Sequence, residues 1–413
     1  MNYSHHLNTQ RFSQATEANA AACVQNLSNW ADAVHEIRSW PEYEPQPLRT
    51  LPNLASQVGI SKLFFKDESK RFGTTLGSFK ALGAPYAVYR ILADAVHASA
   101  GVYPSSAQLR SGQYRDMTQG VTVCVATDGN QGRGLAYGAK IFGCRCVDYI
   151  HNHVSAGRAG AMQMLGAVVI RVDGEYEASV ERVREDARMN GWHFVSSTSW
   201  GDFDGGIPQN VMNAYMVVVE EALSMVPSVG EITHVFVCGG VGSIAAAVFL
   251  GFFARLRKTQ STNLPRFVVV EPSEADCLFQ SSKRGEPCIS HGSLRTLMAG
   301  LACRAPSPAA WKVLSWLASD FVAVPDSAAV DGMKALAGGL GGDIPVVCGE
   351  SSAASVGVLL KAGNDLSLRE NLGLNGNSQV VLFGLEGATD TQIYEELTGM
   401  PPEMVFRAQA CFT

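Results

Sequence analysis

The sequence predicts an α/β protein with two lobes, each built on a mostly parallel sheet flanked by helices. Two observations predict this class. Short apolar runs follow one another along the chain, and a glycine-rich turn and a helix-compatible stretch separate each run from the next. The runs do not alternate with polar residues, which is typical of parallel strands buried on both faces. Strands that alternate with helices indicate βαβ units.

The first group of units lies between residues 121 and 196. We expect strands at residues 121–126, 146–150, 167–172 and 192–195, and helices at 133–142, 158–165 and 178–189. The regular alternation of the two kinds of segment predicts one α/β lobe.

The second group lies between residues 233 and 384. We expect strands at 233–238, 266–270 and 380–383, and a helix from Ser243 to about Leu256. The segment 204–208 (DGGIP) is a plausible crossing point between the groups. These positions predict a second α/β lobe.

The composition excludes several classes of function. The 413 residues include 32 basic and 38 acidic side chains, with a formal net charge of −6 and 46% apolar residues. This mildly acidic balance argues against nucleic acid as a partner, since phosphate binding needs clustered Lys and Arg. No window approaches the roughly 18 apolar residues of a membrane span, and the first thirty residues lack an apolar signal core. We therefore expect a cytoplasmic enzyme or metabolite binder that has no membrane partner.

Cysteine and histidine spacing predicts no metal site. The ten cysteines include no CxxC pair, so a zinc ribbon is not expected, and most are expected to be reduced, buried thiols. His151 and His153 lie two residues apart after a predicted strand. A metal would need further ligands, so we interpret both as surface or core histidines.

A glycine-rich turn predicts a phosphate site. Its residues Gly239, Gly240, Val241, Gly242 and Ser243 directly follow a predicted strand and open a helix. Glycine permits positive φ and close approach of a ligand to the backbone. Free N–H groups at a helix N-terminus favour an anion.

The same turn leaves a second cofactor open. Gly240, Gly242 and Ala245 match the spacing GxGxxG/A, and Glu271 ends the next strand, where a ribose-binding acid would lie. A nicotinamide-dependent oxidoreductase therefore stays as an alternative.

Lys80 is a candidate nucleophile at the start of a long helical pattern. Its neighbours Phe79 and Leu82 are apolar, and the pattern continues through Val96. Removal of an amine from water favours its neutral, nucleophilic form, as a Schiff-base lysine requires. The alternative is a surface lysine whose stem covers apolar neighbours.

Six motifs occur in the order seen in fold-type II pyridoxal-phosphate enzymes, which include the tryptophan synthase β-subunit. They are KDES with RFG and SFKALG, TDGNQGRGLA, GGVGS, EP with ADC, AGLAC with PSP, and GESSAASVG. Over roughly residues 64–390 the chain most resembles the diaminopropionate ammonia-lyase family. The resemblance implies pyridoxal 5'-phosphate, a small amino-acid substrate and a homodimer. It also implies a large cofactor-binding lobe (1–85 and 205–413) and a small mobile lobe (86–204).

The resemblance also implies roles for single residues. Lys80 corresponds to the lysine that carries the cofactor, and Asn130 to the residue that bonds the pyridine 3-oxygen. The five residues of the glycine-rich turn correspond to the phosphate site. Asp128 resembles a general base opposite the lysine, and two such bases would serve both stereoisomers of a substrate. The alternative for Asp128 is a turn or helix cap, since Asp-Gly is a common turn dipeptide.

The chain departs from the family at two places. Ser197 occupies the position of a family acid that would contact a second substrate amine; Asp202 or Asp204 could replace it. The residues 384–387 (GLEG) lack the hydroxyl expected near the pyridine nitrogen. Glu350, Ser351 or Ser352 could take that place, and we predict Glu350 and Ser351 as cofactor-binding residues.

Two further family positions are cysteines. Cys277 and Cys303 lie in segments expected near the mouth of the site. We expect two buried thiols, with a redox-sensitive pair as the alternative.

The predicted function is α,β-elimination on a β-substituted amino acid, giving pyruvate and ammonia. A pyridoxal-phosphate-dependent ammonia-lyase acting on 2,3-diaminopropionate is favoured. A serine- or threonine-type dehydratase and a β-replacement enzyme are the alternatives within this chemistry. The nicotinamide oxidoreductase and a non-catalytic small-molecule sensor are more distant alternatives.

Overall fold

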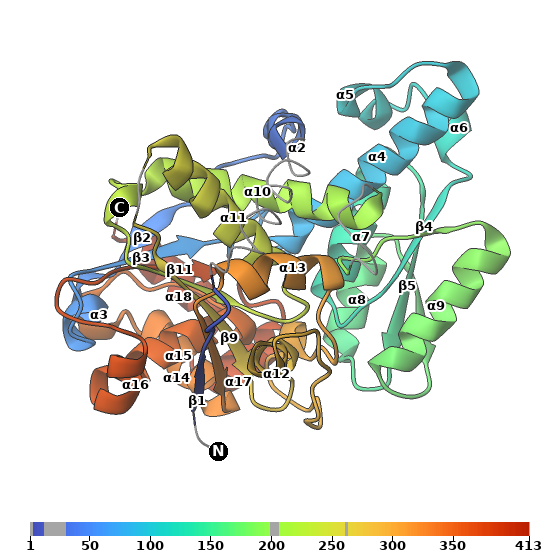
Figure 1. Cartoon of the computed structure of the whole chain (residues 1–413). Coiled ribbons are helices and arrows are strands. Elements are labelled where there is room, and N and C mark those ends of the chain that lie inside the picture. Colours follow the sequence, from blue (N-terminus) through green and yellow to red (C-terminus); the bar gives the residue numbers. More distant parts are fainter. Residues whose placement is uncertain (1–2, 12–29, 199–205, 261–262, 413) are drawn as a thin grey trace.

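The computed structural model describes residues 3–11, 30–198, 206–260 and 263–412, which form two sheets (Figure 1). The larger sheet has the strand order β1-β10-β9-β8-β11-β3-β2. The five inner strands are parallel, and the edge strands β1 and β2 are antiparallel to their neighbours. Its strands are β1 (Ser4–Leu7), β2 (Leu48–Thr50), β3 (Lys62–Asp67), β8 (His234–Cys238), β9 (Arg266–Pro272), β10 (Asp320–Val324) and β11 (Gln379–Gly384).

The smaller sheet is entirely parallel and has the order β6-β5-β4-β7. Its strands are β4 (Thr122–Ala126), β5 (Arg145–His151), β6 (Val168–Val172) and β7 (His193–Phe194). The prediction of two mostly parallel sheets is confirmed.

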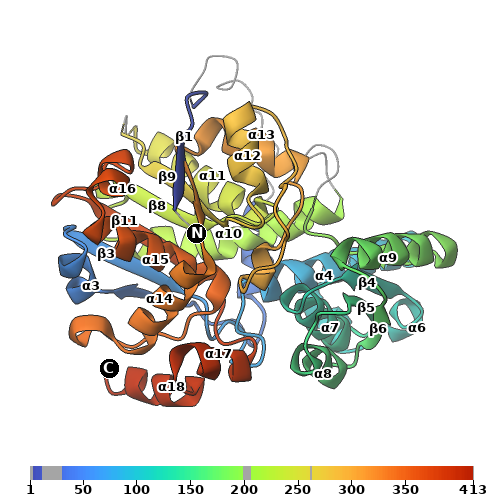
Figure 2. The same ribbon diagram turned by 90° about the horizontal axis from the view of Figure 1, so that it is seen from below.

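Helices cover both sheets. They are α2 (Trp30–Arg38), α3 (Pro52–Gln57), α4 (Lys80–Ala100), α5 (Ser106–Arg110), α6 (Arg115–Thr118), α7 (Asn130–Phe142), α8 (Ala156–Met164), α9 (Tyr176–Asn190), α10 (Ile207–Met225), α11 (Ser243–Lys258), α12 (Cys277–Arg284), α13 (Pro308–Leu317), α14 (Asp326–Ala337), α15 (Glu350–Asn364), α16 (Leu366–Asn371), α17 (Thr391–Thr398) and α18 (Pro402–Ala410), with 3-10 turns at Val229–Glu231, Ala299–Leu301 and Leu340–Gly342. In both views α7, α8 and α9 gather around β4–β6, whereas α10 and α11 lie on one face of the larger sheet and α14 and α15 on the other (Figure 2). None of the described helices is both long and apolar enough to cross a bilayer.

The larger sheet contains strands that the apolar pattern did not predict. The edge strand β1 reads SHHL, and β3 reads KLFFKD with charged residues at its ends. A search for continuous apolar runs misses such strands, because polar or charged residues interrupt the run. The predicted crossing point at 204–208 lies partly outside the described residues, and α10 begins at Ile207.

Small residues let α4 lie close to α7. A Cβ on Gly134 would lie 2.8 Å from the carbonyl oxygen of Lys80, and a Cβ on Gly138 would lie 2.7 Å from Cα of Pro85. A larger side chain at either position would push the helices apart. Because Lys80 and Asn130 are the first residues of the two helices, this contact sets the distance between their backbones.

A buried cluster of four charges fixes the chain that leads to Lys80. Lys66 Nζ lies 2.6 Å from Glu68 Oε1 and 2.7 Å from Glu221 Oε2. Arg71 donates to the same two carboxylates at 2.8 and 2.7 Å. Burial alone would raise the pKa of Glu68, but Arg71 and Lys66 outweigh it, so the pKa is lowered. The four charges sum to zero, so each side chain depends on the others for compensation.

We expect Glu221→Gln to lower the free energy of unfolding by about 3–5 kcal/mol, because it leaves buried positive charge uncompensated. The neighbouring Glu220 pairs with Arg255 at 2.8 Å near the surface. Its replacement, Glu220→Gln, should cost less than about 1 kcal/mol. Urea unfolding of the two variants makes the comparison, and equal losses of stability would contradict a special role for the buried cluster.

Candidate active site

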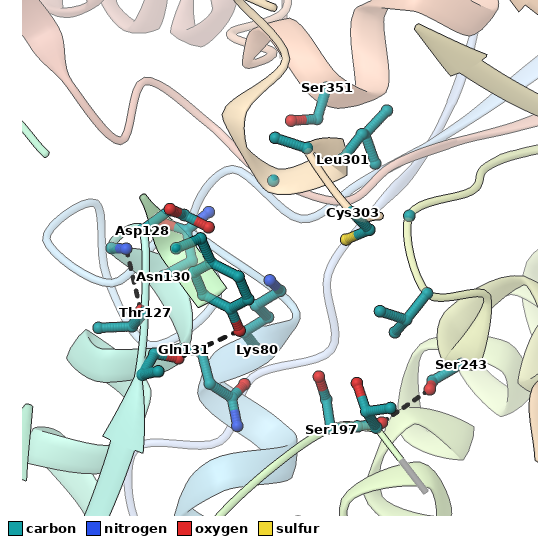
Figure 3. A pocket seen from close by; sticks show the side chains of 18 of the residues that line it. Lys80, Thr127, Asp128, Asn130, Gln131, Ser197, Ser243, Leu301, Cys303 and Ser351 are labelled. Carbon is teal, nitrogen blue, oxygen red and sulfur yellow. Dashed lines mark hydrogen bonds between the residues drawn. The ribbon is translucent and has the colours of Figure 1, made fainter. Parts of the chain in front are cut away.

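A cavity of about 360 Å³ is lined by residues from segments that belong to both sheets. Its lining includes these predicted site residues: Lys80, Asp128, Asn130, Gly239, Gly240, Val241, Ser243, Glu350 and Ser351. Figure 3 shows Lys80, Asp128 and Asn130 along one wall, with Cys303 and Ser351 across the cavity. The structure therefore brings together residues that the sequence places up to 271 positions apart, from Lys80 to Ser351 (351 − 80).

Lys80 reaches the cavity because the chain before it runs beside the end of β11. Phe79 N–H donates to the Leu385 carbonyl at 3.0 Å, and Gly387 N–H donates to the Gly77 carbonyl at 2.8 Å. The carboxyl ends of parallel strands are where α/β sheets bind ligands. Lys80 is half-buried there and lines the cavity.

The glycine-rich turn joins β8 to α11 beneath the same cavity. Gly240 and Gly242 have φ of +67° and +95°, which favours glycine at both positions. Gly242 is not among the lining residues; a Cβ there would lie 2.8 Å from Leu314 Cδ1, so its part is to make the turn. The N-terminus of the 16-residue helix α11 thus faces the cavity and favours an anion.

Glu271 is not available for a ribose. Its carboxylate accepts the N–H groups of Leu278 at 3.1 Å and Phe279 at 2.7 Å, at the start of α12. Burial raises its pKa to about 8, although these two N–H groups oppose the shift. Glu271 does not line the cavity. The nicotinamide alternative depended on this acid, which instead bonds the N-terminus of α12.

Asp128 lies in the loop between β4 and α7 and does not cap the helix. Thr127 Oγ1 accepts the N–H groups of Gly129 and Gly132, both at 3.0 Å. The Asp128 carboxylate instead forms a 2.7 Å hydrogen bond with His151 Nε2. The interpretation of His151 as an ordinary surface or core histidine overlooked this contact.

Three residues at the start of α15 were candidates for the pyridine nitrogen. Glu350 accepts a hydrogen bond from Arg158 at 3.0 Å; burial raises its pKa to about 7, with the charge of Glu386 adding and Arg158 opposing. Ser352 Oγ accepts the Leu385 N–H at 2.9 Å. Ser351 Oγ is buried and has no hydrogen-bond partner among the described residues. Ser351 therefore has a hydroxyl left for a ligand.

Glu386 lines the cavity but was not predicted as a site residue. It accepts the Asn130 Nδ2 amide at 2.6 Å and the Ser351 N–H at 3.2 Å. Arg133 in turn donates to Asn130 Oδ1 at 2.6 Å, so both ends of the Asn130 amide are engaged. The sequence did carry a signal for Glu386, which is an acid just after the apolar run 380–383. Arg158 also lines the cavity and was not predicted, and no local pattern in the sequence pointed to it.

The remaining predictions concern Ser197, its two possible replacements, and the two cysteines. Ser197 lines the cavity, and its carbonyl accepts the Ser243 hydroxyl at 2.8 Å. Asp202 and Asp204 lie outside the described residues. Cys277 is buried and Cys303 half-buried, and both are unpaired thiols. Burial raises the pKa of Cys303 to about 12.

The site fits pyridoxal 5'-phosphate by its own chemistry. An amine on Lys80 can hold an aldehyde, the glycine-rich turn at α11 suits a phosphate, and the unpartnered Ser351 hydroxyl suits a ring nitrogen. Fold and site together define a pyridoxal-phosphate-dependent enzyme.

Comparison with known proteins names the family. A profile described as "Pyridoxal-phosphate dependent enzyme" matches residues 40–383. The chain is 35% identical over 359 residues to a diaminopropionate ammonia-lyase of Escherichia coli (strain K12), covering 86% of this chain and 87% of that protein. The chain belongs to the diaminopropionate ammonia-lyase family.

Solved structures of a member of this family have the same fold. The holo diaminopropionate ammonia lyase from Escherichia coli, with selenomethionine incorporated, superposes with a TM-score of 0.82 at 30% identity, over 96% of this chain and 97% of that chain. The same enzyme in complex with D-serine gives a TM-score of 0.80 at 30% identity and the same coverage.

Proposed function

We propose that the chain catalyses α,β-elimination on a β-substituted amino acid, releasing pyruvate and ammonia, with 2,3-diaminopropionate as the favoured substrate. The observation that carries the proposal is that one cavity is lined by the Lys80 amine, the Asp128 carboxylate and the glycine-rich turn. Relatives at 33–35% identity are named diaminopropionate ammonia-lyase.

Each side chain has a proposed task. Lys80 would hold the cofactor through Nζ and can take or return a proton at the substrate α-carbon. Residues 239–243 would hold the phosphate. Ser351 would hold the ring nitrogen, and Glu350 and Asn130 would support the ring. When bound, pyridoxal phosphate supplies an electron sink for the electrons left at the α-carbon.

Asp128 is the second proposed base. Its loop follows β4 in the smaller sheet, whereas Lys80 begins α4 beside the end of β11 in the larger sheet. Two bases that come from segments of different sheets support proton removal from both stereoisomers, each serving the isomer whose α-hydrogen faces it. An Escherichia coli relative has been crystallised with D-serine, which supports a D-amino acid as one substrate.

Ser197 favours a second candidate substrate. It brings a hydroxyl, not a carboxylate, to the cavity, so a hydroxyl-bearing amino acid such as serine suits this wall. A serine-type dehydratase is therefore the second proposed function. Glu181, which also lines the cavity, supplies negative charge for a second ammonium, and this keeps diaminopropionate as the favoured substrate.

The arrangement of lobes supports a further proposal. Arg158 with Glu350 and Ser155 with Asp390 join helix α8 to the larger lobe. We propose that residues 86–204 form a lobe that closes over substrate and excludes water. The homodimer and the cytoplasmic location are proposed on the resemblance and the composition.

The test is to assay the holoenzyme with D- and L-2,3-diaminopropionate, D- and L-serine, and L-threonine. Diaminopropionate should yield one pyruvate and two ammonia molecules with uptake of one water, whereas serine should yield one of each. We expect diaminopropionate to give the highest kcat/KM. A higher value with serine would favour the dehydratase, and a cofactor-loaded protein that releases ammonia from none of them would refute elimination.

A further inference from the structure

The hydrogen bond between His151 and Asp128 follows from the topology of the smaller sheet. β4 and β5 are parallel neighbours with Ala126 opposite Tyr149. Their carboxyl ends therefore meet at one edge, where Asp128 follows β4 and His151 ends β5. The side chain of His151 is only 14% exposed, so this hydrogen bond is largely shielded from water.

The second ring nitrogen of His151 determines which tautomer of the neutral ring is present. His153 donates its backbone N–H to His151 Nδ1 at 3.3 Å, so Nδ1 is an acceptor and carries no proton. In the neutral imidazole the proton is then on Nε2, which donates to Asp128 Oδ1 at 2.7 Å. Tyr176 packs its ring at 90° against the imidazole, with 6.4 Å between the ring centres.

Asp128 is held through its backbone carbonyl and through one carboxylate oxygen, so the other carboxylate oxygen is left for the site. Arg158 Nη1 lies 3.5 Å from the Asp128 carbonyl oxygen and steadies the loop. Among the described residues, His151 is the side chain that bonds the carboxylate, and it does so through Oδ1. Oδ2 is therefore the oxygen that remains for a substrate proton, and it lies on a residue that lines the cavity.

We infer that His151 is a positioning residue for Asp128: its Nε2–H holds Oδ1 so that Oδ2 is aimed at the α-carbon of one substrate stereoisomer. The inference rests on the proposed role of Asp128 as a base. It assigns no proton transfer to His151, which keeps its Nε2 proton throughout. A base displaced by about 1 Å can lose on the order of 10²-fold in rate.

The inference is tested on the holoenzyme by incubating it with D-alanine or L-alanine in D2O. NMR measures the rate at which the α-hydrogen of each isomer is replaced by deuterium. Alanine has no β-leaving group, so the measurement succeeds or fails independently of the proposed elimination. We expect His151→Phe to lower kcat for exchange from one isomer by roughly 10- to 100-fold. KM should stay within about twofold, and the other isomer should be unaffected. The isomer affected should be the one that Asp128→Asn affects.

Three controls make the result decisive. His151→Gln keeps an N–H donor on the side chain and should restore most of the lost rate. His153→Phe alters an exposed histidine that pairs with Glu175, keeps the backbone N–H, and should leave both isomers unchanged. In an Asp128→Asn background, His151→Phe should cause no further loss. An equal loss with both isomers, a full further loss in that background, or wild-type rates for His151→Phe would overturn the inference.

Discussion

Replacement of Lys80 by alanine is expected to lower kcat for elimination by at least about 10²–10⁴-fold, the range associated with loss of a positioned proton-transfer group. The variant should also lose its covalent hold on pyridoxal phosphate, because no other lysine lines the described part of the cavity. Borohydride reduction followed by mass spectrometry of peptides should locate the cofactor on Lys80 in the wild type and on no residue of Lys80→Ala.

A matched control is Lys140→Ala. Lys140 is an exposed residue in the last turn of α7, outside the cavity. Its replacement should leave both cofactor content and turnover unchanged. Cofactor reduced onto a residue other than Lys80 in the wild type would contradict the assignment.

The second large effect is expected at Asp128. Asp128→Asn removes the proposed base but keeps the shape of the side chain, so turnover of one stereoisomer should fall by about 10²–10⁴-fold. Turnover of the other isomer, which we propose loses its α-proton to Lys80, should change little. Pyruvate release from the separate D- and L-isomers of diaminopropionate measures the effect.

Asp173→Asn is the control for this substitution. Asp173 also precedes a glycine, follows strand β6 of the same sheet, and is exposed. It should behave like wild type with both isomers. A uniform loss with both isomers in Asp128→Asn would point to general damage of the site and against a stereospecific base.

Local pattern was enough to predict much of the site. The glycine-rich turn lies in one short segment, and a strand, a turn and a helix suffice to place it. Lys80 needed the context of several motifs, because one lysine beside apolar residues is uninformative by itself. Asp128 was identified by resemblance, with a turn or helix cap as the alternative. The structure shows that Thr127, and not Asp128, accepts the N–H groups at the start of α7.

The rest depends on contacts between distant segments. Asn130 and Glu386 are 256 positions apart, and Arg158 and Glu350 are 192 apart. No local pattern reports such pairs, because only the packing of the two lobes makes them neighbours. The GxGxxG spacing failed as a guide to the cofactor for a similar reason. The strand and the turn are alike in nicotinamide-dependent and pyridoxal-phosphate-dependent enzymes. What separates the two is the contact of Glu271, which bonds the N–H groups at the start of α12 and is not left for a ribose.

The buried charge cluster at Lys66 has a consequence for the response of the enzyme to salt. Dissolved ions cannot approach four charges that water does not reach, so added electrolyte should leave the turn before Lys80 in place. By contrast, Arg304 and Glu177 form a 3.4 Å pair at the cavity, and their side chains are 42% and 47% exposed. Screening should weaken this pair first, so a rise in ionic strength should loosen the part of the cavity lined by Arg304 and Glu177 while the chain before Lys80 keeps its shape.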